Sequence, residues 1–400
     1  MKIVAVGGAG RYFQPALETL AASDLVSEIV IAGRRLASAE AAAARAGPRC
    51  RAVEVDALDE PALTALATSA DLLINVTGPY FKTLLPVLRA AIAGGAHYLD
   101  YSEDGATVEA ALALDEAAKA AGVLALLGMG EAPGINNLVA VEVCRRLDRA
   151  EALTFGWIED VESIFGGAAE SLAEIEASGR VSGALQAVLH YCSGQIKTYR
   201  DGAWVKVEAS QDEGLLPTPG GETATGYLFG TAEVITLPRY LPDLRSVTAL
   251  AGVSPPPANE LLRRQAARIG RGEVDEQRAA IEFFSALANE PERWLAGERD
   301  PELRLNAVVA EGLKDGRPAR CSATINWNLE TLAARDGIGT AAPLALAALD
   351  ICAGRLPQRG VLPPEACYEP APFLHRLKQD FDLFDPDRAE ILESRLEWLE

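Results

Sequence analysis

The sequence has little of the chemistry that metals, disulfides and nucleic acids require. Its 400 residues include three histidines and six cysteines, all far apart and without a Cys-x-x-Cys pair. This spacing predicts neither a metal site nor a disulfide framework, because both need clustered side chains. Basic residues are outnumbered, 37 against 57 acidic ones, which gives a formal net charge of −20. So acidic a chain lacks the basic surface that binds nucleic acid or an anionic membrane.

Long apolar runs are missing as well. No uninterrupted apolar stretch approaches the ~20 residues that span a bilayer. Lys2 begins an apolar, strand-like run where a signal peptide would stand. We therefore expect a cytoplasmic protein. With 49% hydrophobic residues in 400, the chain can bury a large core and is long enough for two or three domains.

Glycine, in contrast, is concentrated near the start of the chain. The apolar run Lys2–Val6 ends in Gly7-Gly8-Ala9-Gly10, and a helical pattern follows. This order is typical of a buried strand whose following helix approaches a phosphate, because glycine leaves the backbone N–H groups accessible. Phe13 occupies the third glycine position of the usual fingerprint, so a strand–turn–helix without a ligand stays an alternative. The predicted cofactor contacts here are Gly8, Gly10 and Arg11.

The end of the second apolar run bears on which dinucleotide binds. Residues 27–32 are followed by Gly33-Arg34-Arg35. In an NAD site an Asp or Glu at this strand end binds the ribose 2′-hydroxyl. Guanidinium groups instead suit a 2′-phosphate, so Arg34 and Arg35 predict NADP(H), unless they are simply solvated loop residues. Asp56, after the third strand-like run, is a further predicted cofactor contact.

Strand-like and helix-like segments alternate through residue 128. Further strands are predicted over 50–55, 71–76, 97–99 and 123–127, and helices over 39–46, 84–93 and 108–121. Short connections and strands that are apolar on both faces are typical of a parallel sheet covered by helices on both sides. We therefore expect an α/β protein with a Rossmann-type doubly wound sheet.

Beyond residue 150 the pattern changes to antiparallel hairpins. Asp201-Gly202 and Asp315-Gly316 each separate two strand-like runs, as tight turns do. Helices are predicted over 183–192, 260–269, 274–295 and 341–354, and a loop over 211–225. The predicted domains are 1–128, completed by about 338–400, and an α+β substrate and dimerisation domain with an antiparallel sheet over 129–337.

Polar residues stand where two strands of the first domain end. One strand ends in Asn75-Val-Thr-Gly-Pro-Tyr80 and the next in His97-Tyr-Leu-Asp100-Tyr-Ser102. Ligands of open α/β sheets bind beyond the carboxyl ends of the strands. Alternatively, Gly-Pro is an ordinary turn and residues 102–104 cap a helix. The predicted cofactor contacts are Asn75, Thr77, Gly78 and Pro79, and the candidates for proton transfer or amine binding are Asp100, Tyr98 and Tyr80.

The loop Gly128-Met-Gly-Glu-Ala-Pro-Gly-Ile-Asn-Asn137 joins the last parallel strand to the next helix. Its glycines and proline suit a hinge between domains. Glu131 points either to the cleft or to solvent. The candidate substrate contacts of the whole chain are Ser102, Glu131, Asn136, Arg180 and His190.

With these segments in place, the chain resembles the saccharopine dehydrogenase (saccharopine reductase-like) family. In the first domain the resemblance is carried by GGAGRYFQP, AGRR, INVTGPY, HYLDYS and GMGEAPGINN. Further on it is carried by SGALQAVLHYCSGQIKTYRDGAWVKV, EVITLPRYLP, EGLKDGRP and GRLPQRGVLPPE. It implies a discontinuous nicotinamide-binding domain, a second domain that closes over the cofactor, a homodimer, and hydride transfer at a carbon that bears nitrogen.

Two departures from the family pattern argue against saccharopine as the substrate. Ala132 stands where the saccharopine-forming members carry an acidic residue that binds the substrate amine. Val181-Ser182-Gly183 matches the segment that holds their carboxylate-binding arginine, and Arg180 is only adjacent. We expect NADP(H)-dependent reduction of an imine of an amino-acid-like substrate, or the reverse. The alternatives are a reductase of C–OH or C=C bonds and a non-catalytic NADP-binding sensor or scaffold.

Overall fold

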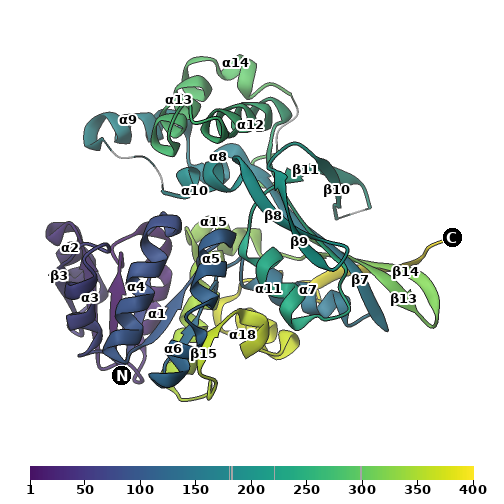
Figure 1. Ribbon diagram of the computed structural model, residues 1–400. Coiled ribbons are helices and arrows are strands. Elements are labelled where there is room, and N and C mark those ends of the chain that lie inside the picture. The colour runs from purple at the N-terminus through teal and green to yellow at the C-terminus, as the bar shows by residue number, and fades with distance from the viewer. Residues whose placement is uncertain (180, 182, 220, 298–299) are drawn as a thin grey trace. The chain divides into compact units, whose positions relative to one another are not determined.

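The computed structural model describes residues 1–179, 181, 183–219, 221–297 and 300–400. The chain forms two compact units, each made of two segments (Figure 1). Unit 1 comprises Met1–Val139 and Asn326–Ile391, and unit 2 comprises Ala140–Ile325 and Leu392–Glu400. These bounds differ from the expected ones, because the C-terminal segment belongs to unit 2 and not to the dinucleotide-binding domain.

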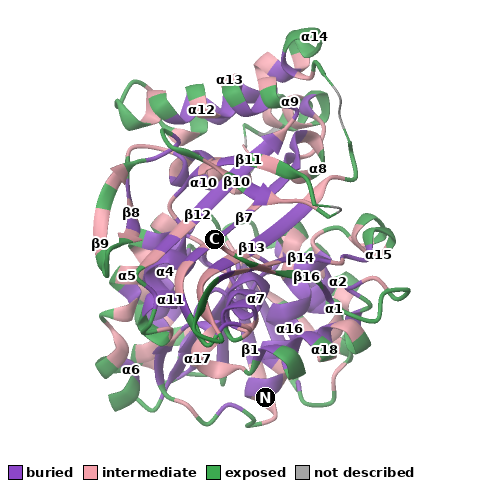
Figure 2. Ribbon diagram, turned by 90° about the vertical axis from the view of Figure 1, so that its right-hand side faces the viewer, coloured by how far each residue is buried: buried purple, intermediate pink, exposed green. Residues whose placement is uncertain are grey.

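Unit 1 contains a seven-stranded sheet in the order β15-β6-β5-β4-β1-β2-β3, and all its neighbouring strands are parallel. Its strands are β1 (Lys2–Val6), β2 (Glu28–Gly33), β3 (Cys50–Glu54), β4 (Leu72–Asn75), β5 (His97–Asp100), β6 (Leu124–Leu126) and β15 (Gly360–Leu362). The predicted doubly wound sheet is confirmed. Its central strands are buried on both faces, as in β4, where every residue is buried. Strand β1 is likewise buried over most of its length (Figure 2).

Helices connect these strands. They are η1 (Arg11–Phe13), α1 (Gln14–Ala22), α2 (Leu36–Ala46), α3 (Glu60–Ala67), α4 (Tyr80–Gly94), α5 (Gly105–Leu112) and α6 (Asp115–Ala120). The second segment adds α15 (Leu329–Ala334), α16 (Ile338–Cys352), α17 (Pro364–Cys367) and α18 (Pro370–Phe381). The helix predicted over 108–121 is divided in two, and α5 begins earlier because Asp104 caps it by accepting a hydrogen bond from the Thr107 N–H at 2.6 Å.

Unit 2 contains a mixed nine-stranded sheet. Seven strands follow the order β10-β11-β12-β7-β13-β14-β16, and β8 and β9 branch from β12. They are β7 (Arg149–Asp160), β8 (Gln195–Arg200), β9 (Ala203–Glu208), β10 (Glu213–Pro217), β11 (Thr223–Leu228), β12 (Ser246–Ser254), β13 (Arg304–Lys314), β14 (Arg317–Ile325) and β16 (Leu392–Trp398). Both predicted hairpins, β8–β9 and β13–β14, are confirmed.

The loop predicted over 211–225 is wrong, because this segment forms the hairpin β10–β11. Its glycines have a packing role. A Cβ on Gly214 would lie 2.7 Å from Leu250 Cδ1, and one on Gly226 would lie 2.9 Å from Leu250 Cβ. The glycines that suggested a loop therefore allow the hairpin to pack closely against Leu250. The central parallel pair of this sheet, β7 and β12, was not predicted either.

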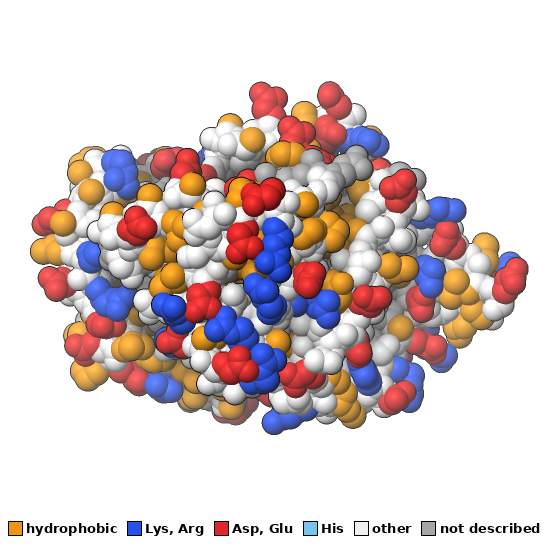
Figure 3. Space-filling view, turned by 90° about the horizontal axis from the view of Figure 1, so that it is seen from above, with side chains coloured by type: hydrophobic (Ala, Val, Ile, Leu, Met, Phe, Trp, Pro, Cys, Tyr) orange, Lys and Arg blue, Asp and Glu red, His pale blue; other side chains and the backbone are white. Residues whose placement is uncertain are grey.

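The helices of unit 2 are α7 (Ile135–Cys144, which crosses the boundary between the units), α8 (Val161–Phe165), α9 (Ala168–Ser178), α10 (Gly183–Tyr191), α11 (Ala232–Tyr240), α12 (Pro256–Gly270), α13 (Glu276–Asn289) and α14 (Pro291–Trp294). Arginines near α12 and α13 pair with glutamates, as in Arg271–Glu273 at 2.6 Å and Arg278–Glu282 at 2.7 Å. Figure 3 shows such basic and acidic side chains intermixed on one face of the molecule. Among the described residues, none of the helices has both the length and the apolar character to cross a membrane.

Candidate active site

The turn after β1 needs glycine for two separate reasons. Gly7 has a φ of +82°, which disfavours any residue with a side chain. A Cβ on Gly7 would also lie 2.3 Å from Thr77 Oγ1 and 2.8 Å from the Val76 carbonyl oxygen. The glycine turn and the end of β4 are thus in direct contact, as a shared dinucleotide site requires.

Sequence reasoning missed the residue that holds this turn from the helix side. The amide of Gln14, at the start of α1, donates to the carbonyls of Gly10 at 3.0 Å and Gly8 at 3.3 Å. Phe13, which departs from the glycine fingerprint, is fully buried. Its ring is part of the core of unit 1. At this position the usual fingerprint has a small residue, which lets the helix pack closely against the strand. Arg11 stays close to the turn, 3.5 Å from a carboxylate oxygen of Asp336.

Two exposed arginines follow β2. Arg34 and Arg35 are both exposed, and no hydrogen bond or ion pair to another described residue engages either guanidinium. A Cβ on Gly33 would meet no atom within 4 Å, so the strand end is open. Asp56 lies beyond the adjacent strand, is exposed, and accepts a hydrogen bond from the Leu58 N–H at 3.0 Å. The end of β2 therefore has room and positive charge for an anionic group.

The segment after β4 presents an unsatisfied hydroxyl. Thr77 Oγ1 is buried and has no hydrogen-bond partner among the described residues, whereas the Thr77 N–H donates to Asn75 Oδ1 at 3.1 Å. A buried hydroxyl without a partner is costly unless a ligand or water completes it. Gly78 is exposed and Pro79 is half-buried, at the start of α4. Thr77 therefore fits a contact to a polar group of the cofactor, but Asn75 is fully buried and supports the loop instead.

Asp100 is fully buried and all its bonds are internal. Its Oδ1 accepts from the Gly128 N–H at 2.7 Å, the Ser102 hydroxyl at 2.9 Å and the Ser102 N–H at 3.0 Å. Its Oδ2 accepts from the Tyr98 hydroxyl at 2.8 Å. Burial raises the pKa of Asp100, although the hydrogen bonds from Gly128, Ser102 and Tyr98 act in the opposite direction. The geometry thus favours a role in joining the ends of β5 and β6 over direct proton transfer.

The two other predicted catalytic groups are also buried. Tyr98 accepts a hydrogen bond from Asn75 Nδ2 at 3.2 Å, and Tyr80 donates to the Asn75 carbonyl at 3.0 Å. Burial raises the pKa of both phenols well above the usual value. A third phenol, Tyr101, is half-buried directly after β5 and packs edge-on against Tyr80, with ring centroids 5.7 Å apart. Tyr101 was not among the residues predicted for the site.

The loop from Gly128 to Asn137 packs against the same edge of the sheet. A Cβ on Gly130 would lie 3.0 Å from Tyr101 Cβ and 3.4 Å from Thr340 Cγ2 of α16. Asn137 Oδ1 accepts from the Gly134 N–H at 2.9 Å, and Asn137 Nδ2 donates to Glu365 at 2.9 Å. The substrate candidates Glu131 and Asn136 are buried in this loop, and Ser102 is buried beside it.

The start of α16 also belongs to this group. A Cβ on Gly337 would lie 2.9 Å from Tyr12 Cα, so the residue before α16 touches η1, which directly follows the glycine turn. Two further predicted substrate contacts are not residues of unit 1. His190 is on α10 in unit 2, where its Nδ1 lies 2.8 Å from Glu276 Oε1. Arg180 lies outside the described residues.

The fold and this group of residues define a class of protein. A parallel sheet with a glycine turn, an unsatisfied Thr77 hydroxyl beside that turn and two open arginines at the next strand end are the features of a Rossmann oxidoreductase that binds a phosphorylated dinucleotide. The residues present fit NADP(H). Glycine backbone would hold the pyrophosphate, and Arg34 and Arg35 the 2′-phosphate.

Comparison with known proteins places the chain within this class. Residues 3–126 match the family model described as the saccharopine dehydrogenase NADP binding domain. The chain is 25% identical over 408 residues to carboxyaminopropylagmatine dehydrogenase of Synechocystis sp., across 94% of this chain and 95% of that one. It is 29% identical over 219 residues to saccharopine dehydrogenase [NADP(+), L-glutamate-forming] of Saccharomyces cerevisiae, across 54% and 46% of the two chains.

A solved structure supports the same assignment for the fold. Apo saccharopine dehydrogenase (L-Glu forming) from Saccharomyces cerevisiae matches with a TM-score of 0.63 at 16% identity, over 99% of both chains. Residues 3–126 thus match an NADP-binding domain, and the chain is an NADP-binding oxidoreductase similar to the saccharopine dehydrogenases. The predicted resemblance, fold class and cofactor are confirmed.

Proposed function

We propose that this protein transfers a hydride between NADP(H) and a C–N centre, reducing an imine of an amine and a carboxylate-bearing carbonyl compound to a secondary amine, or the reverse. The observation that carries the proposal is the 25% identity across 94% of the chain to a dehydrogenase named for carboxyaminopropylagmatine. That name describes a carboxyl-bearing aminopropyl group joined to a guanidino amine. The proposed substrate is accordingly amino-acid-like and carries an amine as well as a carboxylate.

In this proposal NADPH, when bound, supplies the hydride, and the protein aligns the substrate and excludes water. Thr77 and the glycine turn hold the cofactor, with Gly8 and Gly10 as its backbone contacts. Asp100 acts as a positioning residue, because its four hydrogen bonds fix the ends of β5 and β6. Tyr101 is half-buried at that edge, so we propose that its phenol, more than Tyr98 or Tyr80, faces the reacting groups.

Saccharopine itself is disfavoured as the substrate. Ala132 carries no charge at the position where the family resemblance implies an amine-binding acid. The neighbouring Glu131 is a carboxylate in the same loop and is only 7% exposed. We propose that Glu131 contributes to amine recognition, and that a different amine from that of saccharopine is bound.

The test uses NADPH that carries deuterium in the transferable position. The protein is incubated with primary amines, including agmatine, putrescine and lysine, each together with an aldehyde or a 2-oxo acid, and products are analysed by mass spectrometry. We expect deuterium on a carbon next to nitrogen in a secondary amine, and none with the Gly7→Val variant, whose side chain would collide with Thr77.

Two outcomes would contradict the proposal. Deuterium on a carbon that bears a hydroxyl group would identify a carbonyl reductase instead. Tight binding of NADPH with no labelled product from any pair would indicate a sensor or scaffold.

We also propose that the protein is a cytoplasmic homodimer with a contact in unit 2. All six cysteines are free, which suits a reducing compartment. Strand β16 is at the edge of its sheet and exposes two large apolar side chains, Leu396 at 44% and Trp398 at 42%. Exposed apolar groups on an edge strand favour pairing with another chain.

A further inference from the structure

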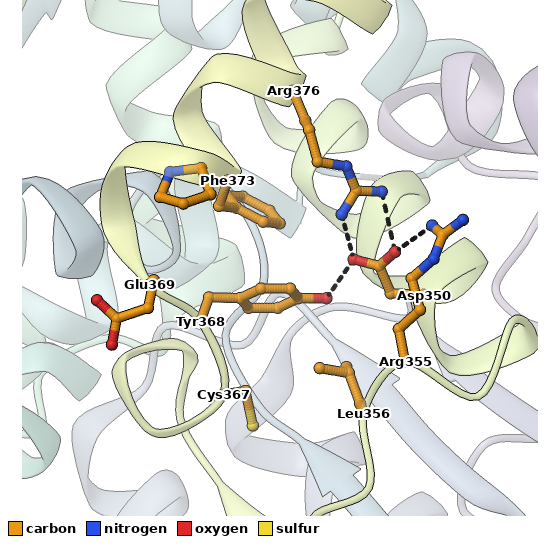
Figure 4. Close-up of a pocket in the computed structure, with 9 residues that line it drawn as sticks. Asp350, Arg355, Leu356, Cys367, Tyr368, Glu369, Phe373 and Arg376 are labelled. Carbon is orange, nitrogen blue, oxygen red and sulfur yellow. Dashed lines mark hydrogen bonds and ion pairs between the residues drawn. The ribbon is translucent and has the colours of Figure 1, made fainter.

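A cavity of about 200 Å³ lies in unit 1, among the end of α16, the segment after it and the start of α18 (Figure 4). It is lined by Asp350, Arg355, Leu356, Cys367, Tyr368, Glu369, Pro372, Phe373 and Arg376. None of these residues takes part in the dinucleotide site described above. Asp350 lies thirteen residues after Gly337, or roughly 20 Å along the axis of α16 at 1.5 Å per residue. The cavity and the glycine turn are therefore at opposite ends of this helix.

The carboxylate of Asp350 organises the cavity. Its side chain is only 2% exposed. Arg376 binds it in a bidentate manner, with Nη1 2.7 Å from Oδ2 and Nη2 2.9 Å from Oδ1. Arg355 Nη1 donates to Oδ1 at 2.8 Å, and the Tyr368 hydroxyl donates to Oδ2 at 3.2 Å. Each carboxylate oxygen thus accepts two hydrogen bonds, so Asp350 has no capacity for a further donor.

Arg355 is the member of this cluster with open donors. Asp350 pairs with both guanidinium groups, and Asp380 also acts electrostatically on Arg376. In Figure 4 the carboxylate of Glu369 points away from the two arginines. The side chain of Arg355 is 59% exposed, and Asp350 is its sole partner among the described residues. Donors of Arg355 therefore stay open to an anion.

The remaining walls of the cavity are apolar. Leu356 is buried, and the rings of Tyr368 and Phe373 lie tilted against each other with centroids 4.4 Å apart. Pro372 adds a further apolar surface. At about 200 Å³ the cavity is smaller than the roughly 300–1,000 Å³ of sites for drug-sized ligands. Its occupant must be small and partly apolar.

We propose that this cavity is a second binding site, separate from the dinucleotide site, for a small monocarboxylate with a compact apolar body. The ligand carboxylate pairs with the open donors of Arg355. The apolar body lies against Leu356 and the rings of Tyr368 and Phe373. A cation of the same size is rejected, because it would meet two guanidinium groups.

The test is isothermal calorimetry with benzoate as the probe, repeated in saturating NADPH. Benzamide and benzylamine, which keep the ring but carry no charge or a positive charge, are the ligand controls. We expect saturable millimolar binding of benzoate with and without NADPH, and much weaker or no binding of the other two. Arg355→Gln removes a largely exposed charge and should weaken benzoate binding at least about tenfold. Arg89→Gln breaks another surface ion pair of unit 1, to Glu60 at 3.0 Å, and should leave binding unchanged.

A second variant fills the cavity without a change in charge. Leu356→Phe should abolish benzoate binding while circular dichroism and NADPH affinity stay as in the parent protein. Absence of binding to the parent protein, or binding that both Arg355→Gln and Leu356→Phe leave unchanged, would overturn the proposal. The cavity would then have no ligand, and the hydrogen bonds to Asp350 would serve only the stability of the fold.

Discussion

Arg34 and Asp100 show what residue type alone reveals about a site. The arginines after β2 could be proposed from the sequence, because that prediction depends only on a strand end and on chemistry within a few residues, and both side chains are exposed in the structure. The role of Asp100 was not, because one of its donors, the Gly128 N–H, lies 28 residues further along the chain. From the sequence alone, a carboxylate at a strand end is interpreted as a catalytic group, because hydrogen-bond donors from distant residues cannot be identified. Its four hydrogen bonds turn it into a support for the site.

At this scale, the double variant Arg34→Ala/Arg35→Ala should reduce the preference for NADPH over NADH. Loss of charge-assisted bonds to a 2′-phosphate costs about 1.5–3 kcal/mol, which corresponds to a decrease in NADPH affinity of roughly ten- to hundredfold. NADH affinity should hardly change, because NADH has no 2′-phosphate. Calorimetric titration with both cofactors measures the two constants.

Arg49→Ala is the matched control, since this arginine is paired with Asp24 at 3.3 Å in the same unit and should affect neither cofactor. An equal loss of affinity for NADPH and NADH in the double variant would mean that the arginines do not read the 2′-phosphate.

Single elements were predictable where their hydrophobic pattern is local, as in β1 and β2, or where an Asp-Gly turn marks a hairpin. The hairpin β10–β11 was missed because its glycines were interpreted as loop residues. In the structure two of them allow close packing against Leu250. Strand β15 has only three residues, too few for any periodicity. Between β5 and β6, His97 ties two elements together, since its Nδ1 accepts a hydrogen bond from the Leu124 N–H at 3.1 Å.

That contact predicts a pH dependence. Burial lowers the pKa of His97 below the ordinary 6.5, so the folded protein binds this proton less readily than the unfolded chain. The stability that neutral His97 contributes is complete above pH 6.5 and is lost as the pH falls toward the lowered value. In urea unfolding, the parent protein should therefore lose more free energy of unfolding than His97→Gln between about pH 7.5 and about pH 5.5.

His375→Gln provides the control, because His375 is exposed on α18 and its replacement should leave the pH profile as it is. Identical profiles for the parent protein and His97→Gln would show that His97 does not contribute.

At the scale of the whole molecule, composition and alternation predicted an α/β chain with an NADP-binding sheet. They did not reveal that the start of α16, from the second segment of unit 1, contacts both η1, next to the glycine turn, and the loop after β6. Contacts between residues more than two hundred positions apart leave no local pattern. The oligomeric state is likewise a property of surfaces and not of single motifs.

Light scattering should give a mass twice that of the 42.3 kDa chain. The double variant Leu396→Glu/Trp398→Glu, which places charge on β16, should shift the mass to that of one chain. Leu58→Glu, at a side chain that is 58% exposed in unit 1, should leave the dimer intact. A single-chain mass for the parent protein would refute the dimer.

The chain passes between the two units three times, at residues 139/140, 325/326 and 391/392. During synthesis from the N-terminus, β6 therefore emerges long before β15, its neighbour in the sheet, and β14 keeps an open edge until β16 has been translated. The sheet of unit 1 is incomplete until β15 has been made, and the sheet of unit 2 is incomplete until β16 has been made. Unit 1 therefore cannot be completed before most of unit 2 has been translated, because residues 140–325 lie between its two segments.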